Sequence, residues 1–186
     1  MNIVSDARPW FIFGSVWSGR FIIAAIVQGA IITGLTLTFV AAQTLTLQIN
    51  IIEFLSLSFE GPAKWIFLGY IFYMILVVAI AVTAVFYNHL EVGMGRQIRG
   101  FRPALAWIHL VGMNVGGAAT TIIMIFAGLA GSGVLDILLG ESDTLQENTA
   151  IMHQFIAPIA IFTGVLSIGV ISGGLAFVMS YLKKLP

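Results

Sequence analysis

Two histidines, His89 and His109, are the residues of this sequence that are best placed to do chemistry. They lie on either side of a short Gly- and Arg-rich connection within the segment 86–119, FYNHLEVGMGRQIRGFRPALAWIHLVGMNVGGAA. If one helix continues to Gly95 and the next begins at Pro103, each histidine is six residues from the turn. At ~1.5 Å per residue, both imidazoles would lie about 9 Å from the turn, at the same depth on two antiparallel helices.

An imidazole pair at one depth has three chemical uses. Two neutral imidazoles on different helices can be the axial ligands of a haem b. The same pair with Glu91 could instead hold copper or zinc, or relay a proton. Asn88 and Asn114 could orient the two rings through hydrogen bonds.

A plainer interpretation needs no cofactor, and we favour it. The end of the first helix then lies among the lipid headgroups, where Glu91 pairs with Arg96 or Arg99 in the turn. His109 forms a hydrogen bond with a neighbouring helix. We therefore expect no metal and no cofactor, with haem b as the alternative.

The composition places these residues in a membrane. Of 186 residues, 59% are hydrophobic and 9% are charged, which is too little polar surface to cover a soluble globule. Stretches of about 20 apolar residues can cross the hydrocarbon core as helices, and they occur at residues 21–42, 65–87, 105–130 and 156–179. We expect one all-α domain over residues 1–186, an integral membrane protein of four helices. The chain has no cysteine, which excludes disulfides and thiolate metal sites.

The basic residues are distributed asymmetrically. Seven of the eight lie before the first stretch, between the second and third, or after the fourth, whereas Lys64 lies on the other side with six of the eight carboxylates. The positive-inside rule then puts both termini in the cytoplasm. We expect a multi-pass protein of the plasma membrane.

Several aromatic residues are typical of membrane interfaces. Trp10, Phe13 and Trp17 recur at spacings of three and four, which predicts a short N-terminal helix at the cytoplasmic interface. The tyrosines of the second stretch, among them Tyr73, are typical of an aromatic belt. The segment Thr44–Phe59 is too polar to cross and is expected to lie along the outer surface.

Glycines mark one face of each of the last two stretches. Gly112 and Gly116 form a small-xxx-small pattern in the third, and Gly169 and Gly173 repeat it in the fourth. Such faces allow two helix backbones to approach closely. We expect them to pack against each other or against another subunit.

At this hairpin the sequence resembles the closing helices of subunit I of the haem-copper oxidases. The second stretch and its exit, GYIFYMILVVAIAVTAVFYNHLEVGMGR, are similar to the helix of that family that ends in an aromatic pair and a Gly-Arg turn. ALAWIHLVGMNVGGAATTIIMIFAGLAG is similar to the next helix, with a His-aromatic start at His109, a Gly-x-Asn at Gly112 and Asn114, and a Leu-Ala-Gly exit at 129–131. IAPIAIFTGVLSIGVISGGLAFVMSYLKK resembles the last conserved helix of the family.

The resemblance fails at the family's metal ligands. Its His-Phe-His-Tyr motif would fall near residues 68–71, where this sequence has no histidine. The resemblance therefore implies a small relative of the oxidase core without an oxygen-reducing centre.

We expect a non-catalytic integral membrane subunit of a respiratory or other oxidoreductase complex of the terminal-oxidase type, which stabilises its assembly. Its expected partners are the lipid bilayer and larger membrane subunits, and we expect no nucleic acid. One alternative is a small electron-transfer protein that binds haem b or quinol through His89 and His109. A second alternative is an accessory subunit of a membrane oxygenase.

Overall fold

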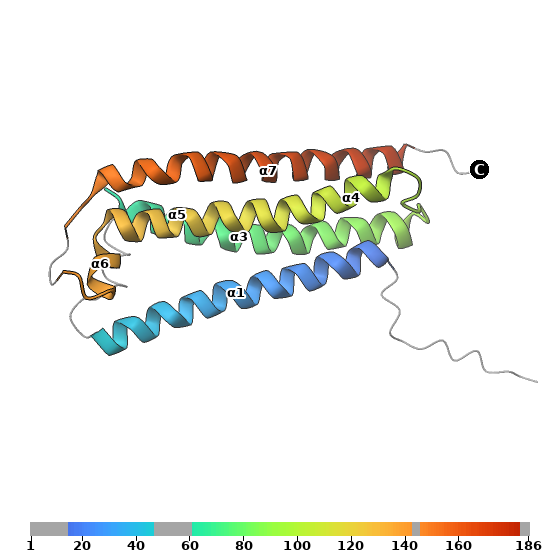
Figure 1. Ribbon diagram of the computed structural model, residues 1–186. Coiled ribbons are helices and arrows are strands. Elements are labelled where there is room, and N and C mark those ends of the chain that lie inside the picture. Colours follow the sequence, from blue (N-terminus) through green and yellow to red (C-terminus); the bar gives the residue numbers. More distant parts are fainter. Residues whose placement is uncertain (1–14, 47–60, 143–145, 183–186) are drawn as a thin grey trace, which may run out of the picture.

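The computed structural model describes residues 15–46, 61–142 and 146–182, and it is all-helical (Figure 1). Its elements are α1 (Val16–Thr46), α3 (Ala63–Asn88), the π-helical turn η1 (His89–Gly93), α4 (Arg102–Val111), the π-helical turn η2 (Gly112–Gly117), α5 (Ala118–Gly131), α6 (Val134–Leu138) and α7 (Thr149–Tyr181). Four helical segments are long and apolar enough to cross a membrane: Val16–Ala42, Ala63–Gly93, Arg102–Gly131 and Thr149–Tyr181. The chain is therefore a multi-pass membrane protein of the expected class.

Local sequence signals fix the ends of these helices. The backbone N–H of Ser18 donates to Oγ of Ser15 at 3.0 Å, which caps α1. Pro103 lies in the first turn of α4, where its missing N–H costs little. The side chain of Asn148 accepts a hydrogen bond from the N–H of Ile151 at 3.3 Å and so caps α7.

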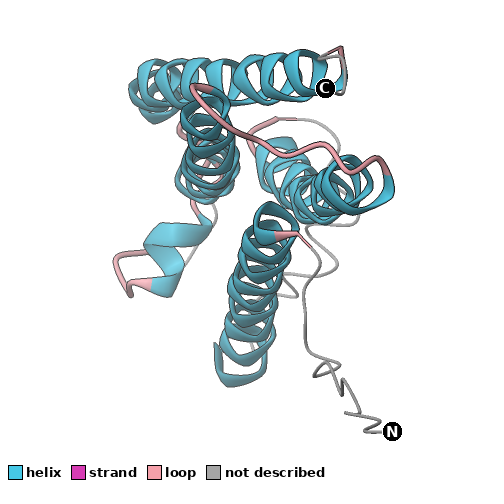
Figure 2. Cartoon of the chain, turned by 90° about the vertical axis from the view of Figure 1, so that its right-hand side faces the viewer, coloured by secondary structure: helices cyan, strands magenta, loops and turns pink. Residues whose placement is uncertain are grey.

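The hairpin of α3 and α4–α5 is the centre of the molecule. α1 packs on α3, and α7 packs on α4, η2 and α5. Seen along the helices, α1 and α7 lie on opposite sides of this central pair (Figure 2). The four spans therefore form an open arrangement with two outer helices, each of which has a broad face that the described residues do not cover.

The predicted N-terminal interfacial helix is not supported. Trp17 belongs to the first turn of α1 and is buried, and Trp10 and Phe13 lie outside the described residues. The spacing that suggested an interfacial face continues through Phe21 and Ala25, so it is the start of the buried stripe of α1. Thr44 likewise belongs to α1, and residues 47–60 lie outside the description.

The two ends of the described structure differ in charge. We call the end where α1 begins and α3 turns into α4 the arginine end, because it carries Arg20, Arg96, Arg99 and Arg102. The opposite end, which we call the lysine end, carries Lys64 at the start of α3. α7 finishes at the arginine end, where Nη1 of Arg102 donates to Oγ of Ser180 at 3.2 Å.

Candidate functional site

His109 is buried where all four spans meet. Its Nδ1 lies 3.3 Å from the hydroxyl of Tyr87 on α3. Its ring centroid is 5.1 Å from that of Phe21 on α1. On the fourth side, its ring occupies the place where a side chain at Gly173 of α7 would begin. This imidazole therefore fills the junction of the bundle and has a polar partner within it.

His89 has different surroundings. Its side chain is exposed, and its ring lies beside Gly93 in η1. His89 comes two residues after Tyr87, so the two side chains are about 200° apart around the helix axis and lie on opposite sides of the helix. Because Tyr87 faces His109, His89 faces away from it. The structure does not bring the two imidazoles together as the ligands of one haem.

The other candidates near His89 do not form a metal site either. Asn88 is exposed. Glu91 accepts a hydrogen bond from Oγ of Ser15, which ties the start of α1 to the end of α3. Nε and Nη1 of Arg96, one of its expected partners, have no hydrogen-bond partner among the described residues. Within that part of the chain, no group of three or more His, Cys, Asp or Glu residues is placed to hold a metal.

Asn114 belongs to a separate polar cluster in the middle of the spans. Its Oδ1 accepts a hydrogen bond from Nε2 of Gln28 on α1 at 3.0 Å. The hydroxyl of Tyr73 on α3 donates to Oε1 of Gln28 at 2.5 Å. Nδ2 of Asn114 donates to the carbonyl of Leu110 at 2.8 Å, one turn earlier in the same span. Gln28 therefore joins three spans, and its hydrogen bonds satisfy polar groups that hydrocarbon could not satisfy.

The four packing glycines lie between α7 and the span formed by α4, η2 and α5. A Cβ on Gly112 would lie 2.6 Å from Cα of Gly169, and one on Gly116 would lie 2.5 Å from the backbone N of Leu166. Real Cβ atoms do not approach backbone so closely. Because Gly173 has no side chain, the ring of His109 can occupy the space beside it. The two glycine faces therefore meet within the chain.

These polar groups join helices to one another. Gln28 joins α1 to α3 and to η2, and Tyr87 joins α3 to α4. In a low-dielectric interior, a polar group that loses such a partner is costly. Tyr73 is fully buried, so the expected place for it in an interfacial belt is wrong. Its hydroxyl is within reach of Gln28, which removes the need for water.

Comparison of the chain with protein-family models, with curated proteins and with solved structures found no match.

Proposed function

We propose that this protein is a non-catalytic integral subunit of a larger membrane oxidoreductase complex, and that it is held there by the outward face of α7. The oxidoreductase part of the proposal comes from the resemblance of the last three spans to the closing helices of haem-copper oxidase subunit I. An accessory subunit of a membrane oxygenase would satisfy the same resemblance. The subunit part comes from the structure of α7.

The observation that carries the proposal is a row of small residues on the uncovered side of α7. Ala160, Gly164, Ser167 and Gly174 are exposed and lie within about 80° of one another around the helix, in an arc that also holds the exposed Ile171. At Gly164 and Gly174 a Cβ would meet no atom within 4 Å in the part of the chain that the structure describes. In the most apolar 18-residue segment of α7, only 11% of the residues are buried against the rest of the described structure. The corresponding segment of the span formed by α4, η2 and α5 is 50% buried.

Exposure to lipid explains large apolar side chains, but it does not explain this row. Lipid tails are as apolar as leucine, so a lipid-facing helix gains nothing from bare backbone. Small residues at regular spacing let a second helix approach closely, and close packing is what drives helix association in membranes. The row therefore favours another transmembrane helix as its neighbour.

The test of this proposal is purification of the tagged chain from its own membranes in a mild detergent. We expect it to migrate far above its mass of 20.0 kDa, together with redox subunits, and to be colourless after separation from them. A stable monomer would contradict the subunit proposal. A Soret band that stays with the separated chain and disappears in His109→Ala would favour the haem alternative.

We further propose that both termini are cytoplasmic and that the membrane is the plasma membrane. The positive-inside rule supports this orientation, because the arginine end and the two lysines near the C-terminus would then face the cytoplasm. Reporter fusions at Lys184 and at Ser142 should report opposite sides of the membrane, with Lys184 inside. The reverse orientation, or the same side for both, would overturn this assignment.

A further inference from the structure

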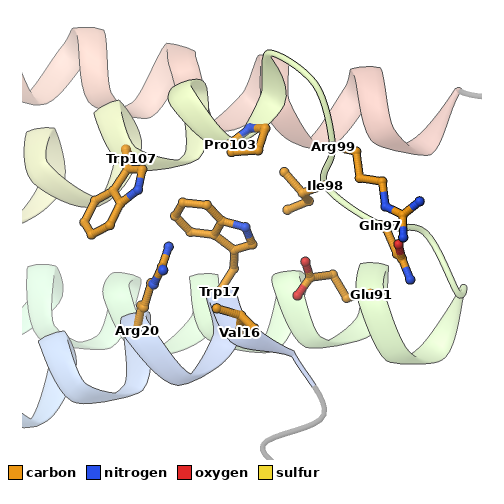
Figure 3. Close-up of a pocket in the computed structure, with 9 residues that line it drawn as sticks. All are labelled: Val16, Trp17, Arg20, Glu91, Gln97, Ile98, Arg99, Pro103 and Trp107. Carbon is orange, nitrogen blue, oxygen red and sulfur yellow. The ribbon is translucent and has the colours of Figure 1, made fainter.

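A pocket of about 560 Å³ opens at the arginine end, between α1, the end of α3 and the start of α4 (Figure 3). Its lining includes Arg20 and Arg99, the indoles of Trp17 and Trp107, and the carboxylate of Glu91. It lies at the boundary of the spans, where tryptophans and snorkelling arginines are at headgroup depth. Its ligand would therefore meet both charge and aromatic surface.

The guanidinium of Arg20 is held in a fixed place in this pocket. Its Cζ lies 4.6 Å from the ring centroid of Trp17 and 4.7 Å from that of Trp107. Cation–π contacts of this kind orient a guanidinium but leave its charge and its N–H donors available to an anion. Arg20 is therefore positioned as an anion-binding group before any ligand arrives.

The charge of the pocket is positive. Among the described residues, two guanidinium groups line it with one carboxylate, and that carboxylate, Glu91, already takes a hydrogen bond from Ser15. Arg96 lies in the same turn but does not line the pocket, and its Nε and Nη1 lack hydrogen-bond partners among the described residues. Arginine donors in a fork match the oxygens of a phosphate group.

Trp107 also lines a second, apolar pocket. It has a volume of about 360 Å³ and lies between α4 and α7, along Trp107, Val111, Val165 and Ile168. Trp107 thus separates a charged pocket at the headgroup level from an apolar groove deeper in the spans. A phosphate in the first and a hydrocarbon chain in the second are the two halves of a phospholipid.

We propose that the arginine end binds one anionic phospholipid, with its phosphate at Arg20, the rest of its headgroup towards Arg99, and an acyl chain in the groove along Val111 and Ile168. Basic pockets between transmembrane helices are a common form of headgroup recognition. The bound lipid fills both sides of Trp107 and so links α1, α4 and α7 at this end of the bundle.

The test compares lipids that differ only in the headgroup. The purified full chain in neutral detergent is titrated with phosphatidylglycerol or with phosphatidylcholine of the same acyl chains, and binding is measured by native mass spectrometry. We expect phosphatidylglycerol to bind preferentially. Free glycerol phosphate at the same concentration should neither bind nor compete, because it lacks the chain that fills the groove.

Variants separate the two halves of the site. We expect Arg20→Gln and Arg99→Gln each to weaken phosphatidylglycerol binding about tenfold, or about 1.4 kcal/mol. Lys64→Gln removes the same charge from the lysine end and should leave binding unchanged. Ile168→Trp fills the groove from an exposed position and should weaken both lipids. Arg99 is exposed, so its variant tests the proposal even if Arg20→Gln does not fold.

Three outcomes would overturn the proposal. Equal binding of the two lipids would remove the role of the guanidinium groups. An equal loss in Lys64→Gln would reduce the preference to general electrostatic attraction. Competition by free glycerol phosphate at the same concentration would indicate a phosphate site that does not require a lipid.

Discussion

Both the inward and the outward face of α7 carry glycines, but the surroundings of the two sets of glycines differ. On the inward face, Gly169 meets Gly112 of η2 backbone to backbone, and Gly173 makes room for His109. On the outward face, no atom of residues 15–46, 61–142 or 146–182 lies within 4 Å of the Cβ position at Gly164 or Gly174. A glycine pattern in the sequence therefore indicates a surface that another helix can approach closely. It does not indicate whether that helix belongs to the same chain.

The inward face should be the more sensitive of the two. In Gly112→Leu, even the first side-chain atom would lie 2.6 Å from Cα of Gly169, and backbone cannot move aside as a flexible side chain can. Overpacking of this kind typically costs about 1 to 3 kcal/mol, and here we expect a loss of about 3 kcal/mol or more. Thermal unfolding of the purified chain in detergent measures it. Unchanged stability would mean that α7 does not pack on η2 as described.

The junction at His109 is the next most sensitive place. His109→Ala removes the ring that fills the space beside Gly173 and leaves the buried hydroxyl of Tyr87 without its partner. We expect a loss of about 1 to 3 kcal/mol. His89→Ala is the control, since an exposed side chain should change stability by less than about 0.5 kcal/mol. Equal effects of the two variants in chemical unfolding would contradict the different burial of the two histidines.

The polar cluster in the middle of the spans should have a smaller effect. Asn114→Ala leaves Nε2 of Gln28 without its better acceptor, although the carbonyl of Asn114 remains 3.4 Å away. Hydrogen bonds between transmembrane helices are typically worth about 0.6 kcal/mol and at most about 1.7. We expect a destabilisation of about 1 kcal/mol. Thr163→Ala, an exposed polar-to-Ala control on α7, should be neutral under the same conditions. A loss above that of His109→Ala would reverse the ranking.

The length of the apolar stretches and the scarcity of charged residues within them were enough to predict the membrane class and the four spans. A helix that crosses the bilayer needs both features. The predicted spans fall within the observed ones, and the observed helices extend further at their ends. At α1 the difference is due to Ser15, whose capping hydrogen bond starts the helix before Trp17. The cap lies in the S-V-W-S sequence, where an interfacial helix was expected instead.

The partners of polar residues were harder to predict. The equal depth of His89 and His109 follows from counting residues, but the direction of each ring depends on rotation about the helix, and Tyr87 takes the side that faces His109. Gln28 and Tyr73 are distant in sequence from Asn114, so only the packing of α1 on α3 reveals their contact. A glutamine in an apolar span did carry a signal, since it needs a hydrogen-bonding partner.

The outward face of α7 should be insensitive to substitution in the isolated chain and sensitive in an assembly. Gly164→Leu places a side chain where no atom of the described residues lies within 4 Å of the Cβ position. We expect its free energy of unfolding to change by less than about 0.5 kcal/mol, as for other exposed positions. Ala81→Leu, a small-to-large change on the exposed side of α3, is the matched control.

The central claim is tested most directly by the size of the complex that the tagged Gly164→Leu variant forms in native membranes, measured by native gel electrophoresis after mild solubilisation. We expect wild type and Ala81→Leu to migrate in a large assembly, and Gly164→Leu to migrate as a folded single chain. An unchanged assembly in Gly164→Leu, or a single chain for wild type itself, would contradict the claim that the outward face of α7 binds another membrane subunit.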